Sequence, residues 1–254
     1  DMTVHAQRPT EKLLEVTGLT VAYGQAEVVH GVSLEVRRGE FVVVLGRNGA
    51  GKTTILHAVS GLIPKVAGEV RLAGKDISRA VPRTIVRDGV IQVLEGHRVF
   101  TNLSIEDNLL IGTYAKASSG DRSKLPRIYE LFPELADRKH SLASGLSGGQ
   151  QQILAVAQGI IGDPHLLILD EPSAGLAPIV VDRILQVANR LCADGIAVLL
   201  VEQLVEKAMR YANYCYLIET GRVVGEGAAA EVQDAEMLRK VFLGGTAHDG
   251  AARQ

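Results

Sequence analysis

Short apolar runs alternate with longer amphipathic stretches over most of this chain. Between the runs come helical periods of ten or more residues, clearest at 180–193 and in the stretch that follows Ser147. Strands that alternate with helices of this length are typical of a mainly parallel sheet covered on both faces. The pattern therefore predicts an α/β fold. The runs that predict buried strands are 41–45 (FVVVL), 89–94 (GVIQVL), 165–172 (HLLILDEP) and 196–201 (IAVLLV).

Two regions depart from this alternation. Residues 13–36 read as two strands with turn residues between them, and 68–77 reads as a further hairpin, which together predict an antiparallel β subdomain near the N-terminus. Helical periods fill 104–145, broken by the loose segment 118–124, and predict a helical subdomain at about 100–160.

The end of the chain and its domain limits are predicted in the same way. We expect a helix from Leu204, a strand pair around Gly221 and a last helix over 228–243. Residues 1–12 and 246–254 are polar or small and lack a period, so we expect flexible ends around one domain at 13–245.

Composition narrows the function classes. With 46% hydrophobic and 22% charged residues, the 254-residue chain has an ordinary globular composition. A net charge of −2 gives no reason to expect nucleic acid as a partner. No apolar run could cross a bilayer, and no basic-then-apolar leader opens the sequence, so we expect a soluble intracellular protein. Cys192 and Cys215 lie in apolar stretches, which favours core thiols in a reducing compartment.

The stretch GRNGAGKTT at 46–54 is the strongest chemical signal. It fits the phosphate-loop pattern G-x-x-x-x-G-K-[ST], and it lies between a predicted strand and a predicted helix, as that motif requires. Its glycines allow successive amides to turn toward one anion, and the helix start adds its positive dipole end. Lys52 would reach the outer phosphates, and the Thr53 hydroxyl would ligate Mg²⁺. The expected nucleotide-binding residues are Gly46, Asn48, Gly49, Ala50, Gly51, Lys52, Thr53 and Thr54.

Two further stretches carry site chemistry. The apolar run at 165–172 ends in Asp170 and Glu171; Asp170 could hold Mg²⁺ through water, and Glu171 could activate the water that attacks the terminal phosphate. The stretch LSGGQ at 146–150 places a hydroxyl and two glycines at a helix start, where a second protein molecule could offer them to the same nucleotide. Tyr23 either packs on the sheet or stacks on the base.

These motifs together resemble the ATP-binding-cassette ATPases, and the resemblance runs from about residue 13 to 245. It implies a P-loop NTPase cassette that binds ATP and Mg²⁺ and dimerises head to tail, as a homodimer or heterodimer. It also implies that Tyr23 contacts the base, that Ser147, Gly148, Gly149 and Gln150 contact the partner's nucleotide, and that Lys52 and Glu171 take part in hydrolysis.

Finer features resemble the ATP-binding subunits of high-affinity branched-chain amino acid importers. They are the segments at 94–109, 129–135, 201–203 and 242–245. The urea-importer branch is close, and Glu95 favours the amino acid branch. Glu95 stands where most cassettes carry glutamine, and it is a candidate ligand of the nucleotide and of Mg²⁺. Gln203 stands where most carry a histidine; it is a candidate contact of the γ-phosphate because an amide can still donate a hydrogen bond.

The resemblance implies a peripheral subunit on the cytoplasmic face of the membrane. Its partners would be membrane permease subunits, a second ATP-binding subunit and, indirectly, a periplasmic or extracellular solute-binding protein. The alternatives are an ATPase of a urea or short-chain amide importer, a soluble iron–sulfur assembly ATPase, a lipopolysaccharide-exporter ATPase, and a regulatory subunit that does not hydrolyse ATP.

Overall fold

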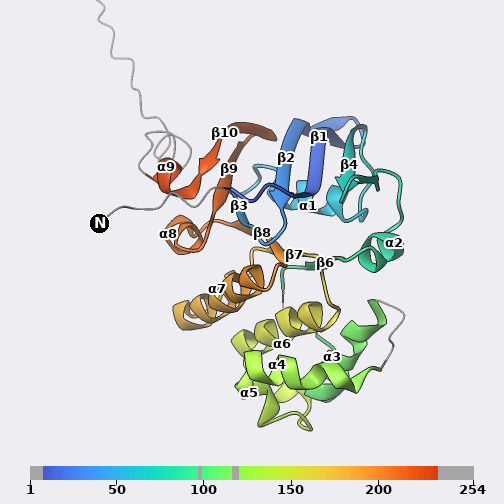
Figure 1. Ribbon diagram of the computed structural model, residues 1–254, viewed down its shortest axis with the longest axis vertical. Coiled ribbons are helices and arrows are strands. Elements are labelled where there is room, and N and C mark those ends of the chain that lie inside the picture. Colours follow the sequence, from blue (N-terminus) through green and yellow to red (C-terminus); the bar gives the residue numbers. More distant parts are fainter. Residues whose placement is uncertain (1–7, 97–98, 116–119, 234–254) are drawn as a thin grey trace, which may run out of the picture.

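The computed structural model describes residues 8–96, 99–115 and 120–233 (Figure 1). Its larger sheet has the strand order β10-β9-β3-β8-β7-β6. The pairs β3/β8, β3/β9, β7/β8 and β6/β7 are parallel, and β10 runs antiparallel to β9. These strands are β3 (Phe41–Leu45), β6 (Val90–Val93), β7 (Leu166–Asp170), β8 (Ala197–Glu202), β9 (Tyr214–Glu219) and β10 (Arg222–Ala228).

A second sheet is antiparallel along its pairs and has the order β2-β1-β4-β5. The first hairpin turns at Gly24, whose φ of 63° lies in the left-handed region that glycine adopts without strain. Alternate residues of β1 and β2 are buried, as expected for a sheet with one face on the core. The strands are β1 (Lys12–Tyr23), β2 (Ala26–Arg37), β4 (Ala67–Leu72) and β5 (Lys75–Asp76).

The helices fall into two groups. Helices α3 to α6 gather at the end of the molecule opposite the antiparallel sheet, and the others lie beside the larger sheet and its connections (Figure 1). Serine side chains cap the N-termini of α3 and α6, at Ser104 and Ser147. The helices are α1 (Lys52–Val59), α2 (Pro82–Arg87), α3 (Ile105–Gly112), α4 (Leu125–Leu131), α5 (Pro133–Ala136), α6 (Gly148–Ile161), α7 (Pro178–Ala193), α8 (Val205–Met209) and α9 (Ala229–Gln233).

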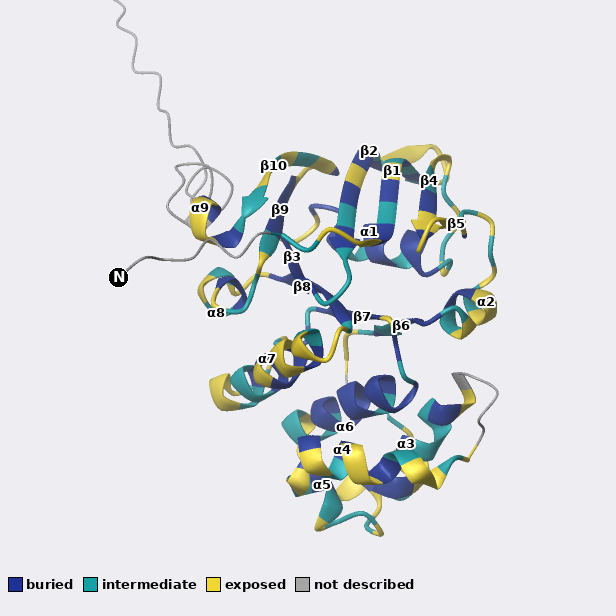
Figure 2. Cartoon of the chain, viewed as in Figure 1, coloured by how far each residue is buried: buried dark blue, intermediate teal, exposed yellow. Residues whose placement is uncertain are grey.

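The core lies on both faces of the larger sheet. Every residue of β3, β7 and β8 is buried (Figure 2). In β3, Val43 and Leu45 pack in one apolar cluster with helices α6 and α7, whereas Val42 and Val44 pack in another with α1 and the antiparallel sheet. Strands covered on both faces have continuous apolar sequences, which explains the runs seen in the chain. The predicted α/β fold with a mainly parallel core is confirmed.

The two ends differ in part from expectation. Residues 1–12 were expected to be flexible, yet the Arg8 guanidinium lies 2.6 Å from the buried carboxylate of Glu40 and 2.9 Å from the partly buried carboxylate of Glu35. It also stacks 3.6 Å from the ring centre of Tyr214. A single arginine whose partners lie far along the chain leaves no periodic signal in a sequence. Residues 1–7, the expected tail at 246–254 and most of the expected helix at 228–243 lie outside the described residues.

Candidate functional site

The phosphate-loop residues connect the carboxyl end of β3 to the first turn of α1. Gly49 and Gly51 have φ angles of 77° and 99°, so both use the left-handed region. A Cβ atom on Gly46 would lie 2.4 Å from the carbonyl oxygen of Ile218, which leaves room for glycine alone. The amide of Gly221 donates to the carbonyl of Ala50 at 2.9 Å and ties the loop to the β9–β10 turn. The loop is therefore held from outside, with its helix start available to an anion.

Lys52 lies across the mouth of this loop. Its side chain is 3% exposed, and its Nζ atom donates to the carbonyl oxygens of Gly46 at 2.9 Å and Arg47 at 3.1 Å. The same atom lies 3.2 Å from a carboxylate oxygen of Glu171. A buried ammonium needs such partners, so a phosphate entering the loop would compete with Glu171 for this cation.

Thr53, in the first turn of α1, lies beside Asp170, the last residue of β7. The Thr53 hydroxyl donates to Oδ1 of Asp170 at 3.0 Å. His57, one turn further along α1, has its Nε2 4.0 Å from Oδ2 of the same carboxylate. Burial raises the pKa of Asp170, and the bond from Thr53 opposes that rise. Sequence reasoning missed His57, although its spacing of four residues from Thr53 places both on one helix face.

Glu171 and Gln203 are joined directly. The Gln203 amide donates to Oε2 of Glu171 at 2.6 Å. Glu171 has a φ of 41°, an unusual value for a residue other than glycine. Backbone strain of this kind is often found at functional sites. One carboxylate thus contacts both Lys52 and Gln203, which the sequence placed in the same hypothetical site but could not show to be in contact.

Glu202, which sequence reasoning did not single out, directly precedes Gln203 in the chain. It is 1% exposed and accepts hydrogen bonds from the backbone of Ser173, Gln203 and Leu204. Burial raises the pKa of Glu202, and its hydrogen bonds oppose that rise. A signal was present in the sequence, because Glu202 is a charged residue at the end of an apolar strand.

Two cavities border the phosphate loop. One of about 390 Å³ is lined by Gly46, Arg47, Asn48 and Gln203. The other, of about 180 Å³, is lined by Val28, Gly49, Gly51, Lys52, Thr53, Thr54 and Glu171. Within the described residues no group of three or more His, Cys, Asp or Glu side chains could hold a metal by itself. Thr53 and Asp170 still suit Mg²⁺, which commonly binds one or two protein ligands together with substrate phosphates.

Three expected contacts of the nucleotide lie outside these cavities. The residues at 146–150 cap α6 within the helical group, and Ser147 and Gly148 are exposed there. Tyr23 lies at the end of β1 with 53% of its surface exposed. Glu95 is exposed just after β6 and is near enough to Asp170 to raise the pKa of that carboxyl. None of the three lines a cavity at the loop.

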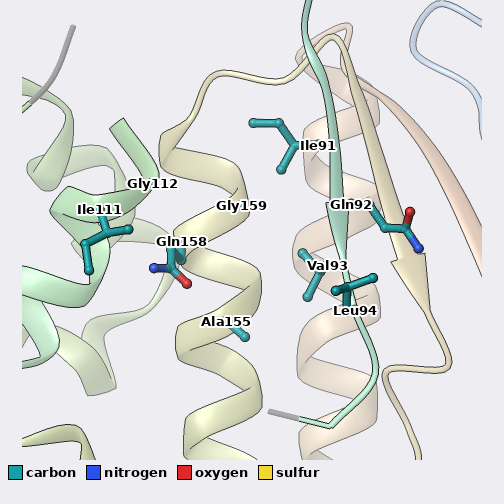
Figure 3. Close-up of a pocket in the computed structure, with 9 residues that line it drawn as sticks. All are labelled: Ile91, Gln92, Val93, Leu94, Ile111, Gly112, Ala155, Gln158 and Gly159. Atoms are coloured by element: carbon teal, nitrogen blue, oxygen red, sulfur yellow. The ribbon is translucent and has the colours of Figure 1, made fainter. Parts of the chain in front are cut away.

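A separate cavity of about 260 Å³ lies between β6 and the helices α3 and α6 (Figure 3). Ile91 and Val93 face it from the strand, whereas the Gln92 side chain points to the other side of the strand (Figure 3). Its lining carries no ionisable side chain. This cavity is therefore a poor site for a charged phosphate, and the phosphate-loop cavities remain the candidate site.

The fold and this cluster define the class of the protein. A strand, a glycine-rich loop and a helix carry Lys52 beside the two acidic residues at the end of β7, one strand beyond β8 in the same sheet, which is the arrangement of a P-loop nucleoside triphosphatase. A family model described as "ABC transporter" matches residues 29–174. The chain belongs to this family and is an ATP-binding subunit whose ATP hydrolysis is coupled to transport.

Relatives extend the match beyond that segment. The high-affinity branched-chain amino acid transport ATP-binding protein BraG of Pseudomonas aeruginosa is 36% identical over 92% of this chain and 100% of its own length. The probable branched-chain amino acid transport protein LivF of Archaeoglobus fulgidus is 32% identical over 91% and 99%. The lipopolysaccharide export protein LptB of Escherichia coli is 31% identical over 91% and 97%.

Solved structures agree on the fold. A crystal structure of the ADP conformation of an ATP-binding cassette from an ABC transporter superposes with a TM-score of 0.82, at 22% identity, over 92% of this chain and 100% of that one. A dimeric cassette in a post-hydrolysis state, bound to ADP and Pi, gives a TM-score of 0.75 at 24% identity over 85% and 99%. Among the described helices none is both long and apolar enough to cross a membrane.

Proposed function

We propose that this chain hydrolyses ATP to drive uptake of branched-chain amino acids through a membrane permease. The observation that carries the proposal is the joined cluster of Lys52, Glu171 and Gln203 at the phosphate loop, in a chain 36% identical to BraG over the whole length of BraG. The 31% identity to LptB makes a lipopolysaccharide exporter the second candidate. The chain would lie on the cytoplasmic face of the membrane, against permease subunits that receive solute from a binding protein.

The chain's own residues suggest how the site works. The loop amides and Lys52 would bind the β- and γ-phosphates, with Tyr23 against the base. Mg²⁺ held by Thr53 and Asp170 would neutralise charge on the phosphate oxygens, with Glu95 a further candidate near the metal. Once phosphate takes over Lys52, Glu171 is free to accept a proton from the attacking water. Gln203 would keep its amide between Glu171 and the γ-phosphate.

A second ATP-binding subunit would complete the site. Ser147 and Gly148 are exposed at a helix start and line neither of the cavities at this chain's own phosphate loop. Exposed amides at such an N-terminus suit an anion supplied by another molecule. We propose that residues 146–150 contact the nucleotide bound by a partner cassette, in a homodimer or a heterodimer.

The transport assignment is tested by uptake. A strain lacking the gene, complemented with the wild type or with the Lys52→Ala variant, is assayed for entry of labelled leucine, isoleucine, valine and urea. We expect wild type alone to restore uptake of the branched-chain amino acids. Uptake of urea alone, or normal uptake with a lipopolysaccharide export defect in the deletion strain, would contradict the proposed substrate class.

The metal role of Asp170 gives a separate prediction. Asp170→Asn keeps the size of the side chain and its oxygen for Thr53 but removes the negative charge. Loss of a side chain that holds a metal through its outer shell typically lowers metal affinity by about 10–100-fold. We therefore expect the Mg²⁺ concentration for half-maximal ATPase activity to rise by that factor. ATP binding measured in EDTA should change little. An unchanged Mg²⁺ requirement would remove Asp170 from the metal site.

A further inference from the structure

Glu202 is a buried carboxylate with no role in the proposed chemistry. Its Oε1 accepts from the Ser173 amide at 3.1 Å. Its Oε2 accepts from the Ser173 hydroxyl at 2.8 Å and from the amides of Gln203 at 3.0 Å and Leu204 at 3.4 Å. A carboxylate that is 1% exposed is costly unless its oxygens are satisfied, and here four donors satisfy them. All four donors belong to two loops at the site.

These loops leave the sheet side by side. Strands β7 and β8 pair in parallel up to Asp170 and Val201. The only further backbone link at this point, among the bonds found between the described residues, runs from the Glu171 amide to the Val201 carbonyl at 3.0 Å. Beyond it, the Glu202 side chain takes the place of the missing strand pairing, because it binds the backbone of both loops.

The same two loops carry the contact between Glu171 and Gln203. Glu171 lies two residues before Ser173, and Gln203 directly follows Glu202. The amide of Gln203 can reach the Glu171 carboxylate at 2.6 Å only while the loops keep their spacing. A shift of about 1 Å in a reacting group can cost about 10²-fold in rate, even when the altered residue is remote from the chemistry.

We infer that Glu202 is a positioning residue that holds the Glu171 loop against the Gln203 loop and so aims the Glu171 carboxylate for hydrolysis. The inference rests on the proposed role of Glu171 as the base. Glu202 itself lines neither of the cavities beside the phosphate loop. Its effect should therefore fall on turnover and leave nucleotide binding in place.

The test uses the full chain with its copurified permease. Glu202→Gln preserves volume but turns one acceptor into a donor that faces N–H groups. We expect kcat to fall about 10–100-fold, with the KM for ATP and the binding of a fluorescent ATP analogue changed less than about 3-fold. Ser173→Ala removes one of the four donors and should lower kcat by a smaller factor. Glu206→Gln, an exposed carboxylate on the same segment, is the matched control and should match wild type.

A double variant separates positioning from mere stability. In the Glu171→Gln background the base is already absent, so adding Glu202→Gln should slow single-turnover hydrolysis by less than about 3-fold. The inference would be overturned if the rate reductions of Glu171→Gln and Glu202→Gln simply multiplied in the double variant. It would also be overturned by a kcat equal to wild type in both Glu202→Gln and Ser173→Ala. If wild type shows no ATPase activity that Glu171→Gln abolishes, the proposed function fails instead, and the two failures are thereby distinguished.

Discussion

Replacing Glu171 with glutamine should lower ATP turnover by about 10²–10⁴-fold, the range that a general base contributes. Glutamine keeps the size of the side chain and can still contact Gln203, but it cannot accept the proton of the attacking water. The substitution also removes the negative charge that lies 3.2 Å from the Lys52 ammonium. Since that charge competes with phosphate for Lys52, ATP should bind at least as tightly as in the wild type.

The measurement is a single-turnover hydrolysis assay paired with a binding titration of a fluorescent ATP analogue. Glu206→Gln serves again as the carboxylate control, because Glu206 is an exposed carboxylate on α8. Hydrolysis at the wild-type rate in Glu171→Gln would remove the assigned base. Loss of ATP binding would show instead that Glu171 holds the phosphate loop in shape.

Local patterns were enough to predict most of the fold. The strands β3, β7 and β8 are buried on both faces, so their sequences are continuous apolar runs that stand out from their surroundings. Helix α2 was missed because it has six residues and one buried side chain, Ile85, which is too little for a period. Arg8 was missed for a related reason, since its partners Glu35 and Glu40 lie about thirty residues away.

The site was predictable only as far as spacing along the chain could show it. The phosphate loop is a local motif, so its candidate residues could be read directly from the sequence. The contact between Glu171 and Gln203, by contrast, depends on β7 lying beside β8, and that of Glu171 with Lys52 on β3 lying next to β8. Strand order is set by long-range packing, which a single sequence does not display. Glu202 stayed unrecognised because Ser173, which supplies two of its four donors, lies on a loop 29 residues away.

Gly221→Ala should destabilise the fold more than any other small substitution in the β9–β10 turn. A Cβ atom there would lie 1.9 Å from the carbonyl oxygen of Val28, which belongs to β2 and is backbone rather than a movable side chain. The φ of 71° adds strain for any residue other than glycine. Gly221 also links the phosphate loop to β2, because its amide donates to the Ala50 carbonyl at 2.9 Å and its carbonyl accepts from the His30 amide at 2.8 Å.

The expected cost combines two terms. Left-handed strain for alanine is roughly 1–2 kcal/mol, and overpacking typically adds about 1–3 kcal/mol, so we expect the free energy of unfolding to fall by about 2–5 kcal/mol. Gly74→Ala is the matched control, because Gly74 has a φ of 78° and open space around its missing Cβ. In that variant the free energy of unfolding should fall only by the cost of left-handed strain, about 1–2 kcal/mol. Denaturant unfolding of both variants measures the difference, and ATP affinity should weaken only in Gly221→Ala, where the turn that supports Ala50 must move. An equal loss of unfolding free energy in the two variants would mean that the β2 backbone moves aside without cost. An unchanged ATP affinity in Gly221→Ala would mean that the phosphate loop does not depend on this contact.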